Sequence, residues 1–323
     1  MKVLFLHFPK DSDQIGGVEL PNYFANLGYE VYSVFNKGDR KFRNKYLGNF
    51  EIQDVSEEFL KNNDYDVVIC KSSAYQTYGS AYTSNSTNPV KFNLMPMGIN
   101  RNKNGIDYNF GESEIIKAPV RSMQHVLQTY KDWDSRKDQL IIGASIGTDK
   151  NQLEFLNFVD KADIFDWKIL FAGPIKSPGY MQKMKKIMDK KSICYEYLGY
   201  IPREELAVHL QESKLSVLTT DPRPLQPFDP GPRIIYESVR AGTPCFVNDL
   251  VLVYPDAEKF CFRYSNGDLE SFKSAMQKLK ETNLDGLSKK LYEFGEAHFT
   301  IENACDEIHK KVLSVLQKRS NNV

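Results

Sequence analysis

The sequence has no excess of either charge. Its 323 residues include 42 Lys and Arg and 42 Asp and Glu, so the formal net charge is +0. Such a chain has no overall field to attract nucleic acid or an anionic membrane, although a local basic patch is compatible with the balance. Cysteine is also scarce. The five cysteines form no C-x-x-C pair, which argues against a structural zinc site and favours a reducing, cytoplasmic location.

Several motifs that would define other protein classes are missing. No apolar run reaches membrane-spanning length, and the N-terminal sequence MKVLFLHFPKD becomes charged too soon for a signal peptide. The absence of G-x-G-x-x-G after the first predicted strand argues against a dinucleotide-dependent dehydrogenase. No Asp-x-Asp stands out as a metal motif at a strand end; Asp132-Trp-Asp134 has the spacing but falls in a charged linker. We therefore expect no metal site.

The pattern that is present alternates strands with helices, which is typical of parallel sheets covered on both faces. The length and the ordinary content of 41% hydrophobic and 26% charged residues fit two globular domains. The charged stretch 131–138 suggests a boundary between domain 1–134 and domain 135–300, followed by a C-terminal helix at 301–323. The sequence predicts an α/β fold with two Rossmann-like domains, whose parallel sheets face a cleft.

The predicted elements of each half are as follows. Strands are expected at 2–8, 30–35, 66–70, 90–95 and, more briefly, 120–123, with a helix at 18–27. In the second half, strands are expected at 140–144, 168–172, 193–197, 215–219, 243–248 and 260–264, with helices at 151–161, 180–190, 203–212, 233–241, 269–280, 284–299 and 301–318.

The most informative stretch is Asp229-Pro-Gly-Pro-Arg-Ile-Ile-Tyr-Glu237. A loop that contains Gly231 leads into a helix at Arg233, which stops at Gly242. The N-terminal end of a helix suits an anion such as phosphate, and ionised carboxylates suit a neighbour rich in hydroxyl groups. Phosphate beside a polyol describes a nucleotide sugar. The plainer interpretation is that both acids are solvated loop and helix residues.

The spacing of these acids resembles the E-x7-E motif of glycosyltransferase family 4, whose members have the GT-B fold. In that family the second Glu holds the ribose hydroxyls of the donor, and the first contacts the transferred sugar. The resemblance therefore assigns the ribose to Glu237. It assigns the sugar to Asp229, which is one methylene shorter than the family's Glu.

A second segment, GASIGTDKN at 143–151, places a lysine after a strand and a Gly/Ser loop. A cation there is well placed for a diphosphate. The family has a Gly-Arg…Lys-Gly pattern at this point, in which Lys150 matches the Lys and Ser145 takes the position of the Arg. The resemblance leaves Arg233 as the substitute for that arginine. The alternative is that Lys150 is an ordinary surface lysine.

Two further segments resemble the family. Gly16-Gly17-Val-Glu is similar to its GGxE element, which lies near the donor phosphate and the acceptor; a Gly pair also marks ordinary turns. LGYIPREEL at 198–206 resembles G-x-[VI]-[PS]-x-x-E-L, whose backbone pairs with the donor base, and this implies a base contact at Tyr200 and Ile201. The alternative is a plain strand-to-helix turn.

The catalytic group of the N-terminal half is the least defined part. Family members usually carry Asp-x-His after a middle strand, and this sequence has none. His7 at the end of the first predicted strand and Asp13 in the next loop are the candidate contacts. Together with Asp229 and Glu237, they complete the predicted catalytic set.

The resemblance implies a metal-independent glycosyltransferase, retaining in stereochemistry, with a UDP- or GDP-linked donor and no other cofactor. It also implies that the helix at 301–323 returns to the N-terminal domain. The acceptor would be a glycan, a lipid or another hydroxyl compound. Two alternatives remain. One is a phage-type DNA glucosyltransferase, which the segments 64–68 and 116–121 faintly resemble; DNA is thus a possible partner, but not the favoured one. The other is a nucleotide-binding GT-B protein without transfer activity.

Overall fold

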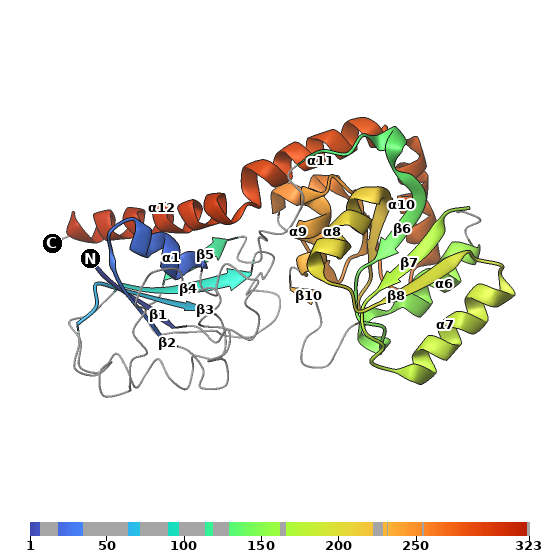
Figure 1. The fold of residues 1–323 in the computed structure, drawn as a ribbon, viewed down its shortest axis with the longest axis horizontal. Coiled ribbons are helices and arrows are strands. Elements are labelled where there is room, and N and C mark those ends of the chain that lie inside the picture. Colours follow the sequence, from blue (N-terminus) through green and yellow to red (C-terminus); the bar gives the residue numbers. More distant parts are fainter. Residues whose placement is uncertain are drawn as a thin grey trace. The chain divides into compact units, whose positions relative to one another are not determined.

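The computed structural model describes residues 1–6, 19–34, 64–71, 90–96, 114–118, 129–161, 166–221, 229–230, 232–253 and 255–321. The chain divides into two compact units. Unit 1 comprises Met1–Gln124 with Thr300–Val323, and unit 2 comprises His125–Phe299. The helices and strands of both are drawn in Figure 1. Within the described ranges, no helix is both long enough and apolar enough to cross a bilayer.

Unit 1 contains a five-stranded sheet in the order β2-β1-β3-β4-β5, with every neighbouring pair parallel. This is the flavodoxin-like order, whose switch point lies between β1 and β3. The elements of this unit are β1 (Lys2–Leu6), α1 (Glu19–Asn26), β2 (Glu30–Val34), β3 (Val67–Lys71), β4 (Val90–Pro96), β5 (Glu114–Ala118) and α12 (Ile301–Ser320).

The fifth strand of the unit 1 sheet was not predicted. The short strand expected at 120–123 lies outside the described residues. The strand that pairs with β4 is β5, which aligns Glu114 with Phe92 and Ala118 with Pro96. Pro119 comes next in the sequence and has no N–H to donate to a ladder. The apolar pair within EIIKA was too short to stand out as a strand.

The C-terminal helix α12 belongs to the core of unit 1. Its buried residues recur at helical spacing and form one cluster with β1, α1 and β3: Val3, Phe5, Leu20, Phe24, Val67, Ile69, Ala304, Cys305, Ile308 and Val312. In Figure 1, α12 runs alongside α1. At this contact the Tyr29 hydroxyl and Nε2 of His309 are 2.9 Å apart. The helix therefore closes a sheet that lies some 300 residues earlier in the chain.

Unit 2 contains a six-stranded parallel sheet in the order β13-β11-β9-β6-β7-β8. Numbered within the unit, this is the 3-2-1-4-5-6 order of a doubly wound Rossmann sheet, with its switch point between β6 and β9. The elements are η3 (Trp133–Ser135), β6 (Lys137–Ile142), η4 (Thr148–Lys150), α6 (Gln152–Lys161), β7 (Lys168–Ala172), α7 (Pro178–Lys190), β8 (Tyr195–Gly199), α8 (Arg203–Glu212), β9 (Ser213–Leu218), β10 (Asp229–Pro230), α9 (Arg233–Arg240), β11 (Cys245–Asn248), β12 (Val251–Leu252), η5 (Pro255–Phe260), β13 (Cys261–Tyr264), α10 (Leu269–Glu281) and α11 (Leu284–His298).

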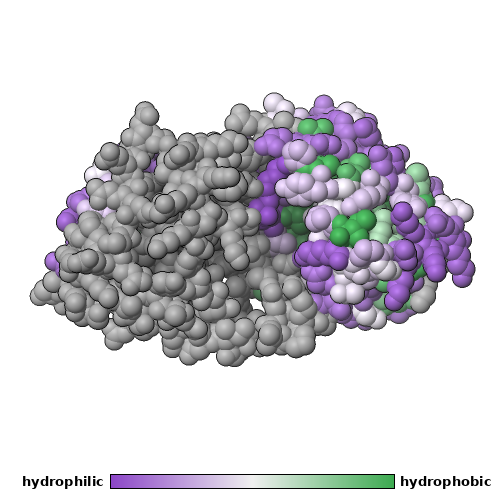
Figure 2. Space-filling model, turned by 60° about the horizontal axis from the view of Figure 1, so that its bottom comes forward, coloured by the Kyte–Doolittle hydropathy of each residue, from purple (hydrophilic) through white to green (hydrophobic). Residues whose placement is uncertain are grey.

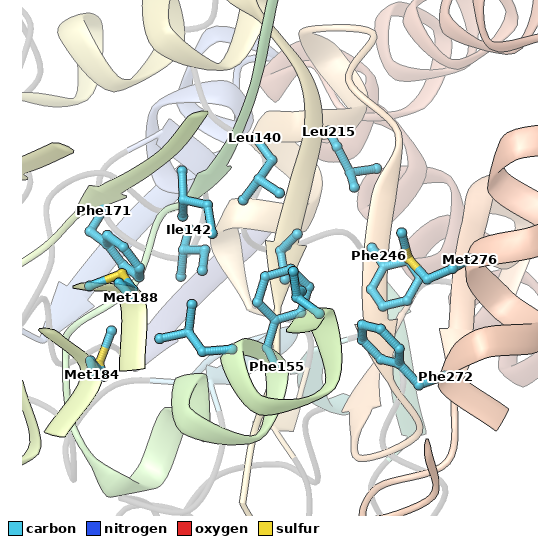
Figure 3. Close-up of a cluster of buried hydrophobic side chains, with 14 of the residues drawn as sticks. Leu140, Ile142, Phe155, Phe171, Met184, Met188, Leu215, Phe246, Phe272 and Met276 are labelled. Atoms are coloured by element: carbon cyan, nitrogen blue, oxygen red, sulfur yellow. The ribbon is translucent and has the colours of Figure 1, made fainter. Parts of the chain in front are cut away.

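The core of unit 2 lies between the sheet and helices α6, α7 and α10. Figure 3 shows Leu140, Phe171 and Phe246 from the strands facing Phe155 and Met276 from these helices. Helices α8 and α9 pack against the same strands. Strands β7 and β11 are buried along nearly their whole length, and their almost continuous apolar sequences made them predictable.

Two short strands of unit 2, β10 and β12, were missed. Asp229 and Pro230, expected in a loop, form β10 and pair in parallel with Val251 and Leu252 of β12. A two-residue strand is too short to produce a periodic pattern. The pairing fixes the backbone that carries Asp229 four residues before α9 begins.

Candidate functional site

The strand order of unit 2 places its ligand-binding edge at the carboxyl ends of β6 and β9. The chain leaves β6 at Gly143. A Cβ at this position would lie 2.4 Å from Cδ1 of Ile234 and 3.6 Å from Cδ1 of Leu206. The glycine therefore lets α9 approach the end of β6 closely. As a result, the start of α9 lies at the switch point.

A second glycine brings the loops after β6 and β7 together. Gly173 has φ of 155°, and a Cβ there would lie 2.2 Å from the carbonyl oxygen of Ala144. The two loops are also linked by hydrogen bonds: the Ile146 N–H donates to Pro174 O at 2.9 Å, and the Lys176 N–H donates to Ile146 O at 2.9 Å. Only glycine tolerates this contact.

The loop that carries Ser145 and Lys150 is held from within. The side-chain amide of Gln152 donates a hydrogen bond to Ser145 O at 2.9 Å. Lys150 belongs to η4 and not to α6. Asn151, at φ 47°, separates the two helical segments. Lys150 was expected at the start of a helix; it lies in a 3₁₀ turn, two residues before α6 begins at Gln152.

Side chains at the end of β9 hold the same loop from the other side of the switch point. The Thr219 hydroxyl donates to Lys150 O, and the Thr220 hydroxyl donates to Asp149 O at 3.1 Å. Asn248 at the end of β11 in turn donates to Thr220 O at 2.7 Å. These positioning residues were not predicted, because their only local signal is a pair of threonines after an apolar run.

The N-terminus of α6 has a different role. The Tyr180 hydroxyl accepts a hydrogen bond from the Leu153 N–H at 2.9 Å, and burial raises the pKa of Tyr180 to about 12. A protonated tyrosine therefore occupies the first turn of this helix. The other helix that starts beside the switch point is α9, which follows β9 and β10 in the chain.

Helix α9 begins at Arg233, and Glu237 follows one turn later on the same side. Pro232 occupies the N-cap position and makes no side-chain capping bond. Residues 234–240 are all buried, with Glu237 only 5% exposed. The helix ends at Gly242, where φ is 69°, as the sequence predicted.

Glu237 forms an ion pair with Arg203, the first residue of α8, through Nη1 and Oε1. The side chains are 21% exposed for Arg203 and 6% for Glu237. Arg203 belongs to the segment 198–206 that resembles a family motif, but no role was predicted for it. A buried carboxylate needs such a partner, because its lost hydration is costly.

The β8–α8 loop immediately before Arg203 carries the two residues expected at a base. Tyr200 is 81% exposed, and Ile201 is partly buried. The loop leaves the sheet at Gly199, with φ of 76°, and Gly199 O accepts from the Gly173 N–H at 2.7 Å. Figure 2 shows one face of unit 2, on which hydrophobic residues form small groups among hydrophilic ones.

The structure therefore brings Ser145, Lys150, Tyr200, Ile201, Arg233 and Glu237 to one edge of the unit 2 sheet. The backbone of Asp229 lies in β10, and its side chain is not described. The remaining candidates lie outside the described residues: His7, Asp13, Gly16, Gly17 and Gly231. Across the described ranges, His, Cys, Asp and Glu form no group suited to a metal ion.

Comparisons with known proteins give likenesses of structure. No protein-family model matches the sequence, and no curated protein matches it. Among solved structures, a glycosyltransferase from Rickettsia africae matches with a TM-score of 0.66 at 13% identity, covering 100% of this chain and 99% of that one. The lipopolysaccharide outer core galactosyltransferase WaaB matches with a TM-score of 0.66 at 15% identity, covering 97% and 99%.

A third match is Anabaena Alr3699/HepE in complex with UDP and glucose. Its TM-score is 0.63 at 10% identity, and the alignment covers 97% of this chain and 100% of that one. At such identities the likeness concerns the fold. Two doubly wound parallel sheets and these full-length matches show that the chain has the GT-B fold, as the resemblance to glycosyltransferase family 4 predicts.

Proposed function

We propose that this protein is a glycosyltransferase that moves a sugar from a nucleotide-diphosphate sugar to a hydroxyl acceptor. The observation that carries the proposal is the buried Glu237 carboxylate, held one turn into α9 beside the switch point of the unit 2 sheet. An ionised carboxylate only accepts hydrogen bonds, so it suits the vicinal hydroxyls of a ribose. The likeness of fold to a protein solved with UDP and glucose supports this choice.

The nucleoside would lie across the ends of β8 and α9. Tyr200 offers an exposed ring and, with Ile201, backbone groups to the base. The ribose would then reach Glu237, to which the same loop is tied through Arg203. We propose a UDP- or GDP-linked donor and no other cofactor.

The diphosphate would lie at the switch point. Lys150 contributes a cation, Ser145 and the backbone at Gly231 contribute polar groups, and Arg233 stands at the N-terminus of α9. Breaking the bond between sugar and phosphate places negative charge on the departing diphosphate. Cations and a helix N-terminus aimed at that charge stabilise it, and we propose that they do so without a divalent metal.

The transferred sugar would contact Asp229, whose backbone is fixed by the β10–β12 pairing. We propose transfer with retention at the anomeric carbon. The acceptor would be a carbohydrate or another hydroxyl compound, near Gly16, Gly17, His7 and Asp13 of unit 1. The balanced charge of the chain does not favour DNA as that acceptor. We place the activity in the cytoplasm, in keeping with the free thiols of Cys194, Cys245, Cys261 and Cys305.

The test is calorimetric titration of the whole protein with UDP, GDP, ADP and their glucose or mannose conjugates. We expect the protein to bind the nucleotides of one base and not those of the other two. Glu237→Gln should weaken binding by on the order of tenfold or more, the size of a hydrogen bond to a charged group. Glu296→Gln, which changes a glutamate paired with the other end of α9, should leave binding within about twofold.

Slow release of free sugar from the bound conjugate would then support transfer chemistry. If the protein binds nucleotide sugars but neither releases the sugar nor transfers it to any acceptor tried, it is a nucleotide-binding protein without transfer activity. Binding of duplex DNA with steep salt dependence would revive the DNA glucosyltransferase. Failure to bind any nucleotide would refute the proposal.

A further inference from the structure

The ion pair between Arg203 and Glu237 joins two parts of the site that lie 34 residues apart in the sequence. Arg203 is the first residue of α8 and follows the β8–α8 loop directly. Glu237 belongs to α9, and the two helices pack against each other. The pair therefore links the loop that presents Tyr200 to the Glu237 carboxylate, one turn into α9.

Because this pair is buried, Arg203 must both neutralise and orient the Glu237 carboxylate. The Glu237 side chain is 6% exposed, so it has lost most of its hydration and needs a countercharge within the protein. A guanidinium meets a carboxylate through a planar set of donors and so fixes its orientation, which a lysine ammonium does less well. A carboxylate has about four lone-pair positions, so it can accept from Arg203 and from ribose hydroxyls at once.

The loop before Arg203 is itself fixed. Gly199 O accepts from the Gly173 N–H at 2.7 Å, and the Tyr197 hydroxyl donates to Gly173 O at 3.0 Å. The Leu206 N–H donates to Pro202 O at 2.9 Å in the first turn of α8. Arg203 thus extends from a rigid segment rather than a free end. Its guanidinium can hold Glu237 at a set distance from Tyr200.

We propose that Arg203 is a positioning residue for nucleotide recognition. It holds the Glu237 carboxylate in the orientation that receives the ribose hydroxyls, and it fixes the distance between that carboxylate and the base-binding loop. This inference rests on the proposed function. A purely structural arginine would only tie α8 to α9, and its loss would weaken every ligand equally.

The test therefore measures discrimination of the ribose rather than affinity alone. The whole protein is titrated with UDP and GDP and with their 2′-deoxy counterparts. The unchanged protein should prefer the ribonucleotide by on the order of tenfold, the size of one hydrogen bond to a charged group. Arg203→Met should bring that preference to within about twofold, whereas Arg203→Lys should retain part of it.

Arg240→Met is the control, because Arg240 pairs with Glu296 at the opposite end of α9; its side chain is 5% exposed, against 21% for Arg203. It should keep the full preference while losing comparable stability. If Arg203→Met does not fold, Arg203→Gln replaces it, since the amide keeps a polar contact without the charge.

A folded Arg203 variant without the charge that still prefers the ribonucleotide tenfold would overturn this inference alone. Failure of the unchanged protein to bind any of the four nucleotides would overturn the proposed function as well.

Discussion

The contact between Gly173 and Ala144 allows a quantitative prediction for Gly173→Ala. The new Cβ would lie 2.2 Å from a backbone carbonyl oxygen, against 3.4 Å or more in an ordinary contact. Overpacking by one methyl group costs about 1–3 kcal/mol. A side chain in a backbone region that favours glycine costs about 1–3 kcal/mol more. We expect a loss of about 3 kcal/mol or more in the free energy of unfolding of unit 2.

The loss should appear in thermal unfolding followed by circular dichroism. For a domain of this size, about 3 kcal/mol corresponds to a fall in the midpoint of roughly 6–12 °C. The backbone that must yield is that of Ala144 and Ser145, in the loop proposed to meet the diphosphate, so nucleotide affinity should fall as well. A strained glycine of merely structural importance would lower the midpoint without changing the affinity.

Gly179 offers the matched control. It lies in the first turn of α7, and a Cβ there has nothing within 4 Å. Gly179→Ala should therefore leave the midpoint unchanged or raise it, because Ala in a helix adds up to about 1 kcal/mol to the free energy of unfolding relative to Gly. If Gly173→Ala were as stable as Gly179→Ala, the close approach of the two loops would be wrong.

Three further predictions concern other parts of the chain. Burial lowers the pKa of Arg136 to about 10, and its guanidinium donates to Thr243 Oγ1 and to Ala241 O, both at 2.9 Å. Arg136→Met should lower the free energy of unfolding measured in urea by about 3 kcal/mol, because these buried acceptors lose their donor. Burial lowers the pKa of His309 below its ordinary 6.5, so the folded state binds fewer protons and stability should fall as pH drops through 6.5; His309→Phe should flatten this dependence. Lys150→Met should weaken nucleoside diphosphate binding about tenfold and reduce its salt dependence, whereas unchanged titrations would remove Lys150 from the site.

Much of the fold could be predicted because its signals are local. The runs that form β7 and β11 are apolar and buried over nearly their whole length, as strands covered on both faces must be. The end of α9 at Gly242 was predictable because φ of 69° suits glycine. Strands β5 and β10 escaped because each is short or mixed in polarity, and each forms through pairing with a distant strand.

For the candidate site, too, the residues with a local sequence signal could be predicted and those that depend on distant contacts could not. Glu237 and Lys150 could be singled out because they belong to short spaced motifs. Thr219 holds the backbone of Lys150 across 69 residues, and Arg203 meets Glu237 across 34. Such pairings depend on strand order and helix packing, and a single sequence carries no local trace of them.

The most direct measurement is a crystal structure of the whole protein with the nucleoside diphosphate that binds most tightly. We predict that the ribose hydroxyls lie within hydrogen-bond distance of the Glu237 carboxylate and that the diphosphate lies between Lys150 and the N-terminus of α9. A nucleotide bound elsewhere, or one that leaves Glu237 paired only with Arg203 and untouched by ligand, would contradict the proposed donor site.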